Sequence, residues 1–203
     1  MVSSATLIAM AEAAFQPAHE RDTTPPAPGD LELVRGFLSL HDHASDARDP
    51  IAPGPASLRW WLRDQGLLPE GADPSTRDLR WAGEVLEALR SRVHENMGAP
   101  RDQAAVDLLD AAGLAAGLQI RFGEATVRPS AGDVRGAVGR ILSIAFLAEL
   151  DGSWDRFKEC SSPTCRGVFW DRSKNRSGRW CTMQECGNRA KVRAYRDRER
   201  SAG

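Results

Sequence analysis

Residues 160–200 read CSSPTCRGVFWDRSKNRSGRWCTMQECGNRAKVRAYRDRER. The stretch holds two C-x4-C pairs, Cys160 with Cys165 and Cys181 with Cys186, separated by 15 residues. Two thiol pairs a hairpin's length apart can converge on one tetrahedral Zn²⁺, which prefers thiolate ligands. Four thiolates fill that coordination shell and leave no position for a catalytic water, so the spacing predicts one structural zinc ion. Two disulfides or four unrelated thiols are the alternatives.

The residues around the cysteines predict a small β-hairpin followed by a helix. Val168-Phe169-Trp170 has the composition of a strand, Ser173 to Gly178 is a polar turn, and Arg179-Trp180 is expected to return as the second strand. A helix is expected from Gly187 to about Arg200, so that its first turn supplies the last ligand. This order is treble-clef-like. A lobe of about 45 residues cannot easily build a sufficient core, so we expect the metal to stabilise the fold itself.

Arginines recur with a helical period after Cys186. They are spaced by 4, 3 and 4 residues and fall within about 40° of one another on a helix, so they form one stripe. The stripe consists of Arg189, Arg193, Arg196 and Arg200. Guanidinium groups bind phosphate bidentately and also read guanine edges, so the stripe predicts a DNA-contacting surface. Val192 and Tyr195 are expected to pack on the hairpin from a neighbouring face.

The polar turn adds further positive charge close to this helix. Its basic residues are Arg172, Lys174, Arg176 and Arg179. Phosphate contacts are what this charge would supply to a DNA complex. The alternative is a solvated basic helix that pairs with an acidic N-terminal part of the chain.

The charge of the whole chain hides an asymmetry between its two parts. The 203 residues carry 27 Lys+Arg and 28 Asp+Glu, for a net charge of −1. Residues 151–203 hold 13 basic and 7 acidic residues, a net charge of +6, which leaves 14 basic and 21 acidic residues, a net charge of −7, for residues 1–150. We therefore predict a boundary near residue 150. Residues 1–30 are proline-rich towards their end and predict a flexible lead-in.

Apolar periodicity predicts helices in the region between the lead-in and the cysteines. Ser57 is expected to cap the second helix, and Asp73 with Pro74 at the first helical position is expected to begin the third. Gly66 and Gly98 would end these two helices. The predicted helices span residues 31–40, 57–65, 74–97 and 101–112.

The period changes from helical to alternating at Leu118. Leu118, Ile120 and Phe122 alternate with polar residues and precede a Gly-Glu turn, which predicts a β-hairpin up to residue 128. A last helix is expected over residues 133–150, and Phe146 and Leu150 are among its many apolar residues. The predicted fold class is mainly α: a helical N-terminal domain over residues 31–150 with a small β-hairpin, and a C-terminal treble-clef-like zinc finger over residues 151–203.

The cysteine stretch resembles the CGNR zinc-finger family of bacterial proteins. The naming motif stands here as Cys186-Gly187-Asn188-Arg189, and the run from Asp171 to Cys181 is also characteristic. The resemblance implies DNA binding by a transcription regulator. The family usually joins the finger to a helical region called the ABATE domain, which is associated with stress-induced transcription regulation, and residues 31–150 fit that layout. Where the family has a V-N-T-like segment, this chain has Leu38 to His43, so a ligand site there would differ in its chemistry.

Other candidate sites are weaker. His41 and His43 resemble metal ligands but have no third ligand nearby in sequence, so a polar loop is the alternative. Trp60 and Trp61 could stack on a ligand or pack in the core. No nucleotide-binding, serine-hydrolase or zinc-protease motif is present, which predicts that the protein is not an enzyme.

The expected partners follow from these features. They are DNA, a small-molecule effector of the helical domain, and a second copy of the chain; the alternative is a zinc-stabilised protein-interaction or small-molecule-binding protein that does not bind DNA. No apolar run is long enough to span a membrane, and residues 1–15 lack the basic residues of a signal peptide. We therefore expect a cytoplasmic location and reduced thiols.

Overall fold

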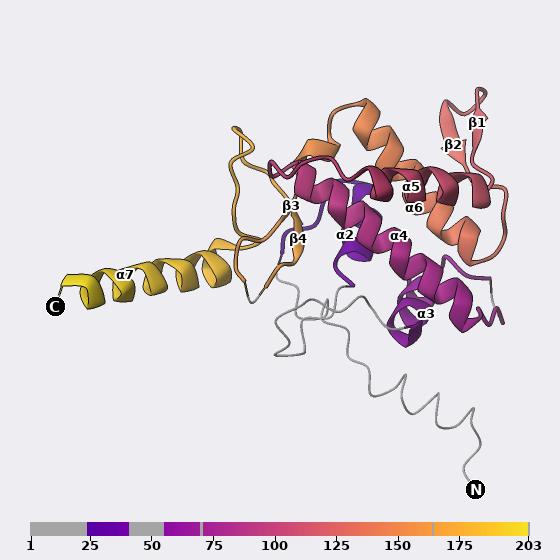
Figure 1. Ribbon diagram of the computed structural model, residues 1–203. Coiled ribbons are helices and arrows are strands. Elements are labelled where there is room, and N and C mark those ends of the chain that lie inside the picture. The colour runs from indigo at the N-terminus through magenta and orange to yellow at the C-terminus, as the bar shows by residue number, and fades with distance from the viewer. Residues whose placement is uncertain (1–23, 41–54, 70, 164, 203) are drawn as a thin grey trace, which may run out of the picture.

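The computed structural model of the protein describes residues 24–40, 55–69, 71–163 and 165–202 (Figure 1). Helices make up most of this part of the chain. They are α2 (Leu31–Leu38), α3 (Pro55–Asp64), α4 (Thr76–Glu95), α5 (Gln103–Ala115), α6 (Val134–Leu150) and α7 (Asn188–Ala202). Two antiparallel hairpins accompany them, β1 (Gln119–Arg121) with β2 (Thr126–Arg128) and β3 (Phe157–Glu159) with β4 (Val168–Trp170). The prediction of a mainly helical fold, with small hairpins and a C-terminal unit of cysteines, hairpin and helix, is confirmed.

Two helices begin at residues other than the predicted ones. α3 begins at Pro55, a residue whose fixed φ suits the first helical position, so Ser57 lies inside the first turn and does not cap it. α4 is capped by Ser75 and not by Asp73. The Ser75 hydroxyl accepts a hydrogen bond from the Asp78 backbone N–H at 3.2 Å and donates one to the Asp78 carboxylate at 2.6 Å. These two hydrogen bonds stabilise the start of the helix at Ser75, which explains why Ser75 and not Asp73 is the cap.

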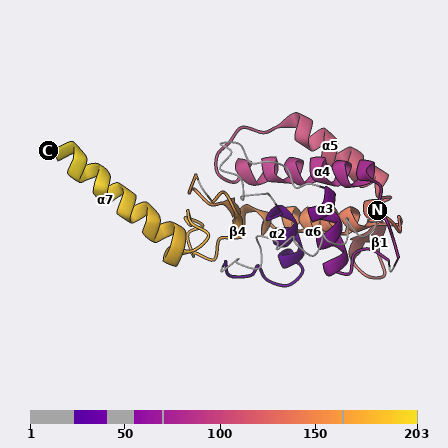
Figure 2. The ribbon, with the colours of Figure 1, turned by 90° about the horizontal axis from the view of Figure 1, so that it is seen from below.

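Helix α4 lies at the centre of the hydrophobic core. It packs against α2, α3, α5 and α6, and its Leu79, Leu86 and Val93 are fully buried. Figure 2 shows α4 and α5 in one layer and α2, α3 and α6 in the other. The predicted helical stripe of α4 therefore faces the core as expected.

The core continues across residue 150 into the cysteine-bearing part of the chain. Trp154, Phe157 and Val168 belong to the same cluster of buried residues as the helices. The ring of Phe157 stands 5.1 Å from the ring of Trp154 and 5.1 Å from that of Trp170. The predicted boundary near residue 150 thus lies within one continuous core. Ala27, in the predicted flexible lead-in, is also buried in that core.

Several large apolar side chains of α6 and of the first hairpin are exposed. Phe146 and Leu150 of α6 are 50% and 69% exposed, and Ile120 and Phe122 of the first hairpin are 70% and 91% exposed. The physical reason is that α6 buries only one side against α2, α4 and α5, while the β1–β2 hairpin projects beyond the helices (Figure 1).

Helix α7 extends away from the rest of the protein. Figures 1 and 2 show it leaving the cysteine region as a free-standing rod. Every residue from Lys191 to Ser201 is exposed. Among the residues that the structure describes, no helix has the length and apolar character needed to cross a membrane.

Candidate metal centre and basic helix

The four cysteine sulfurs form one compact cluster. All four Sγ atoms lie within 4.8 Å of one another. The Sγ atom of Cys181 is 3.6 Å from that of Cys165 and 3.6 Å from that of Cys186. Tetrahedral Zn²⁺ with Zn–S bonds of about 2.3 Å places its sulfur ligands about 3.8 Å apart. The cluster therefore has the size and the donor set of one zinc site.

These distances exclude disulfides between the cysteines, which would require sulfurs about 2.0 Å apart, and all four thiols are free. Hydrogen bonds from Cys165 and Cys181 lower the pKa of the Cys160 thiol to about 2, because they stabilise its thiolate. The hydrogen bond to Cys160 raises the pKa of Cys165 to about 12, and the pKa of Cys181 is also raised. Thiolates this close together repel one another unless a cation lies among them, and Zn²⁺ would supply that charge.

The first cysteine pair sits at the end of the β3–β4 hairpin. Cys160 directly follows β3, and its backbone N–H donates to the Gly167 carbonyl at 2.9 Å. The carbonyl of Ser162 accepts from the backbone N–H groups of Cys165 and Arg166 at 2.9 and 3.1 Å, which closes the turn that carries Cys165. Thus β4 pairs with β3, which precedes the cysteines. The predicted return strand at Arg179-Trp180 is wrong, because that segment is an irregular approach to Cys181.

Cys186 of the second pair lies in a short π-helical turn, Met183–Gly187, that leads directly into α7, and Cys181 comes just before this turn. Thr182 caps this turn, since its hydroxyl accepts a hydrogen bond from the backbone N–H of Glu185 at 3.3 Å. The Asn188 side-chain amide donates to the Gln184 carbonyl at 3.1 Å. Cys186 is therefore held at the junction of the turn and the basic helix, close to the predicted position in the first helical turn.

Arg189 makes the link between the basic helix and the cysteine cluster. Its Nη2 atom donates to the Cys186 Sγ at 3.3 Å. A guanidinium donor to a ligand sulfur stabilises the thiolate and orients it, as outer partners of metal ligands commonly do. This arginine thus contributes to the predicted stripe and also supports the metal centre.

A buried ion-pair network ties α4 to the hairpin that carries the first cysteines. Arg90 of α4 is 2% exposed; it donates to the Leu38 carbonyl at 3.0 Å, to the Glu159 carboxylate, and to the Arg166 carbonyl at 3.1 Å. Glu159 also accepts from Arg166 Nε at 3.0 Å and contacts His94 Nε2 at 2.9 Å. Burial by itself would raise the pKa of Glu159, but the His94 hydrogen bond and the Arg90 charge hold it at about 2.

This network was not predicted from the sequence, although a signal for it exists. Arg90 stands four residues after Leu86 and three before Val93, so it occupies the apolar face of α4. A lone cation on an otherwise apolar helical face indicates a buried partner, because an unpaired buried charge is strongly unfavourable. The partner's identity depends on the fold, since Glu159 lies 69 residues away.

Asp171 organises the basic turn that follows β4. It is 2% exposed and accepts hydrogen bonds from Lys158 Nζ at 2.8 Å and from the backbone N–H groups of Ser173 and Gly178 at 2.9 and 2.8 Å. Burial opposes ionisation of this carboxyl, yet the Lys158 and Ser173 bonds lower its pKa to about 2. A Cβ atom at Gly178 would lie 2.6 Å from an Asp171 oxygen, so this close approach requires glycine. The characteristic run from Asp171 to Cys181 is thus a loop wrapped around one carboxylate.

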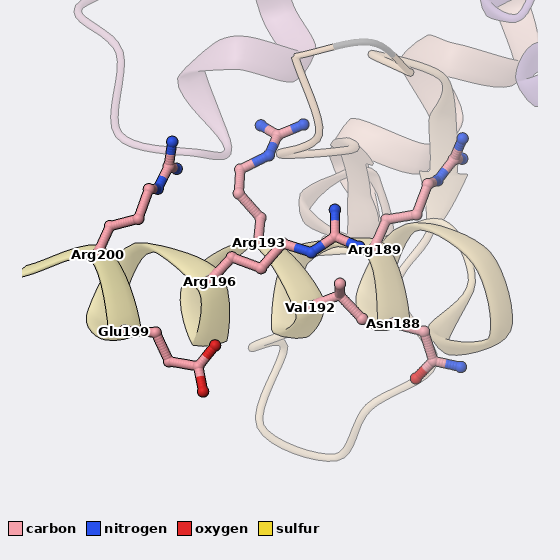
Figure 3. Close-up of a pocket in the computed structure, with 7 residues that line it drawn as sticks. All are labelled: Asn188, Arg189, Val192, Arg193, Arg196, Glu199 and Arg200. Carbon is pink, nitrogen blue, oxygen red and sulfur yellow. The ribbon is translucent and has the colours of Figure 1, made fainter. Parts of the chain in front are cut away.

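The arginines of the predicted stripe lie along one face of α7. They line an open surface hollow together with Asn188, Val192 and Glu199 (Figure 3). The side chains of Arg189, Arg193 and Arg200 extend to one side of the helix, Arg196 lies along it, and Glu199 points to the other side. Arg200 is paired with Asp197, while Arg189 lies 3.9 Å from Glu185.

The apolar residues of α7 do not pack where they were expected to. Val192 and Tyr195 are 49% and 55% exposed, because α7 projects away from the hairpin instead of lying on it. The basic turn residues are exposed, and three of them have partners: Arg176 pairs with Asp155 at 2.8 Å, Arg172 donates to the Pro26 carbonyl, and the guanidinium of Arg179 lies 5.5 Å from the centroid of the Trp180 ring.

The weaker candidates do not form a site together. Trp61 is 2% exposed and packs against Phe37 with ring centroids 5.6 Å apart, so its role is in the core. Trp60 is half-buried and packs against the same core. His41 and His43 lie outside the described residues.

Comparison with known families identifies the C-terminal part of the chain. Residues 156–199 match the family model of the CGNR zinc finger. The predicted zinc finger is therefore confirmed, and its four clustered cysteines form the ligand set of one zinc ion. The match does not extend to residues 31–150, for which the ABATE-like assignment stays a prediction. No curated protein matches the chain.

Proposed function

We propose that this protein is a DNA-binding transcription regulator in which the zinc finger presents α7 to DNA. In this proposal residues 31–150 form an ABATE-like module that senses a ligand or mediates dimerisation, and the protein acts in a bacterial stress response in the cytoplasm without being an enzyme. The single observation that carries the proposal is the exposure of an arginine-lined α7, anchored at the metal centre and clear of the body. The matched zinc-finger family supports nucleic-acid binding only in general terms.

The shape of α7 suits the major groove of DNA. The helix has 15 residues, which corresponds to a length of about 22 Å. The major groove is about 12 Å wide and admits a helix, and every residue of α7 from Lys191 to Ser201 is exposed. In this arrangement Arg193 and Arg196 are the candidates for base contacts, because they lie in the middle of the exposed face.

Charge distribution favours the same orientation. The helix carries six basic and two acidic side chains, and the basic turn adds four more cations beside the metal centre. The net charge of −7 on residues 1–150 would repel a phosphate backbone, so it directs the cysteine-bearing end towards DNA. Lys174 and Arg179 of the basic turn are the exposed candidates for phosphate contacts.

The test is binding to mixed-sequence duplex DNA, measured by fluorescence anisotropy over a series of salt concentrations. We expect the affinity of the zinc-loaded protein to fall steeply with salt, as counterion release requires. Arg193→Glu with Arg196→Glu should reduce the affinity at low salt by at least about tenfold and flatten the salt slope. These two arginines do not contact the cysteine sulfurs, so the zinc content should not change.

The matched control places the same charge change on the body. Arg77→Glu with Arg80→Glu alters two exposed arginines of α4 and the net charge by the same amount. It should leave DNA binding within about twofold of the unmodified protein. If both double variants lost the same DNA affinity, the effect would come from the net charge of the protein and not from contacts made by α7. No DNA binding at low salt would refute the proposal.

A protein-interaction module is the second candidate. The observation in its favour is that Val192 and Tyr195 expose apolar surface in the middle of α7. Aromatic residues beside arginines are typical of protein–protein contacts. This alternative predicts that Val192→Asp, and not the arginine variants, abolishes capture of the protein partner, and that DNA has no measurable affinity.

A further inference from the structure

An apolar surface runs from a groove between α5 and α6 onto the projecting β1–β2 hairpin. The groove has a volume of about 610 Å³ and is lined by Leu109, Leu114, Leu118, Leu142 and Phe146, with charged residues at its rim. Leu118 marks the place where the groove meets the hairpin, since it approaches both Gly113 of α5 and Gly139 of α6. The groove is thus built from the same elements that carry the hairpin.

The apolar surface continues outward along the hairpin. Leu118 directly precedes β1, Ile120 lies at its centre and Phe122 directly follows it, so a large apolar residue recurs at every second position along this strand. Ile120 is 70% exposed and stands opposite Val127 on the partner strand. Phe122, in the hairpin turn directly after β1, is 91% exposed. An apolar projection therefore stands directly beside an apolar groove.

The exposed apolar residues of the protein concentrate here. Five of the nine large apolar side chains that are exposed in the described residues lie on α5, α6 or this hairpin. They are Leu114, Ile120, Phe122, Phe146 and Leu150. At about 100 Å² of apolar surface for each fully exposed side chain, these five expose on the order of 350–400 Å². Leu114 and Phe146 line the groove, and Ile120 and Phe122 belong to the adjoining hairpin; exposed apolar surface of this extent marks an interaction site.

We propose that this surface binds a second copy of the chain, with the hairpin of each protomer seated in the α5–α6 groove of the other. A projection and a groove on one surface are self-complementary, as an isologous two-fold interface requires. A standard interface buries about 800 Å² on each partner, of which about 450–500 Å² is apolar. The five side chains and the groove lining match that area, whereas a ligand in the groove would leave Ile120 and Phe122 uncovered.

The inference deepens the dimerisation half of the proposed function and is independent of DNA binding. The hairpin and groove lie on the body, while α7 leaves from the opposite end of the protein (Figure 1). The dimer would therefore carry two separate basic helices. Because the measurement below contains no DNA, it can succeed or fail whatever the outcome of the DNA experiment.

The test measures the mass of the zinc-loaded full chain by analytical ultracentrifugation over a range of concentrations. We expect a species of twice the 22.1 kDa chain mass. Phe122→Asp and Leu114→Asp should each shift the protein to the mass of one chain while leaving its circular dichroism and zinc content unchanged. Tyr195→Asp is the matched control, since Tyr195 is an exposed apolar residue outside this surface and its variant should remain dimeric.

Photo-cross-linking identifies what covers the hairpin. With Phe122→p-benzoylphenylalanine, we expect a covalent dimer whose cross-linked peptide comes from α5 or α6 of the second copy. The same substitution at Tyr195 should give no such product. A single-chain mass at all concentrations, a dimer that survives both aspartate variants, or cross-links only within one chain would each overturn the proposal. A small molecule retained by a single chain in native mass spectrometry would also overturn it.

Discussion

Replacing Arg90 tests the connection between the helical body and the metal centre. In Arg90→Met the side chain keeps much of its length but loses its charge. It also loses the three hydrogen bonds that Arg90 donates, to the Leu38 carbonyl, the Glu159 carboxylate and the Arg166 carbonyl. Breaking a buried ion pair by removing one partner typically destabilises a protein by 3–5 kcal/mol. Glu159 keeps His94 and Arg166 as partners, so we expect the lower end of this range, about 3 kcal/mol.

The pKa of Glu159 leads to a similar magnitude. Its partners together hold the pKa at about 2, against an ordinary value of 4.5. At 1.36 kcal/mol for each pKa unit, the fold favours the ionised carboxylate by about 3 kcal/mol. Arg90 accounts for part of this stabilisation of the Glu159 carboxylate, and it also donates two hydrogen bonds to carbonyls. A total loss of about 3 kcal/mol on replacing Arg90 therefore agrees with the value expected for a broken buried ion pair.

The assay is thermal unfolding of the zinc-loaded protein, followed by circular dichroism. A loss of about 3 kcal/mol should lower the Tm by about 6–12 °C for a chain of this size. Arg80→Met is the matched control on the same helix; because Arg80 is exposed, we expect its Tm to change by no more than about 2 °C. A loss below about 1 kcal/mol for Arg90→Met, with zinc still bound, would refute the reasoning.

A second readout separates the metal centre from general stability. Arg90 contacts Glu159, directly before Cys160, and the carbonyl of Arg166, directly after Cys165. Loss of such outer contacts commonly weakens metal binding by 10- to 100-fold. At a temperature where both variants remain folded, Arg90→Met should transfer zinc to a chromogenic chelator at least about tenfold faster than Arg80→Met. If zinc left both variants at the same rate, Arg90 would stabilise the helical body without supporting the metal centre.

Two further predictions concern the cysteine-bearing end. Metal analysis should find one zinc per chain, and Cys181→Ser should release it and unfold residues 160–200 while the CD signal of the body helices persists; a folded, metal-free end would contradict the site. Gly178→Ala should destabilise the protein by about 1–3 kcal/mol, since the new methyl group would meet the Asp171 carboxylate at 2.6 Å. Gly123→Ala is its control, because nothing lies within 4 Å of that position; equal changes in urea unfolding would argue against the close-approach explanation.

Local patterns in the sequence were sufficient for the helices and the metal ligands. Helical spacing of apolar residues located α2, α4, α5 and α6 to within a few residues, because each helix buries one face in the core. The two C-x4-C pairs predicted one tetrahedral site because short loops constrain where their thiols can lie. The arginine stripe of α7 was also correct, since side chains at these spacings share a face in any helix.

Those local patterns could not predict which residues pair across long distances in the sequence. Residues 157–159 and residues 179–180 are both compatible with a strand. The packing of Phe157 between Trp154 and Trp170 makes residues 157–159 the partner of β4. The burial of Arg90 depends on Glu159 in the same way. Neither contact leaves a local signature strong enough to identify its partner, because the residues involved meet only after the chain has folded.

The sequence by itself determined which helices form, which four residues can hold zinc, and which arginines share a face, because these properties depend on spacing within short segments. Only the tertiary structure decided what each face meets. It buried Arg90 against the cysteine hairpin, left α7 free of the body, and exposed Phe122 and Phe146 beside one groove. The physical reason is that burial is a property of the assembled core, where contacts between segments far apart in the chain determine which side chains lose their water.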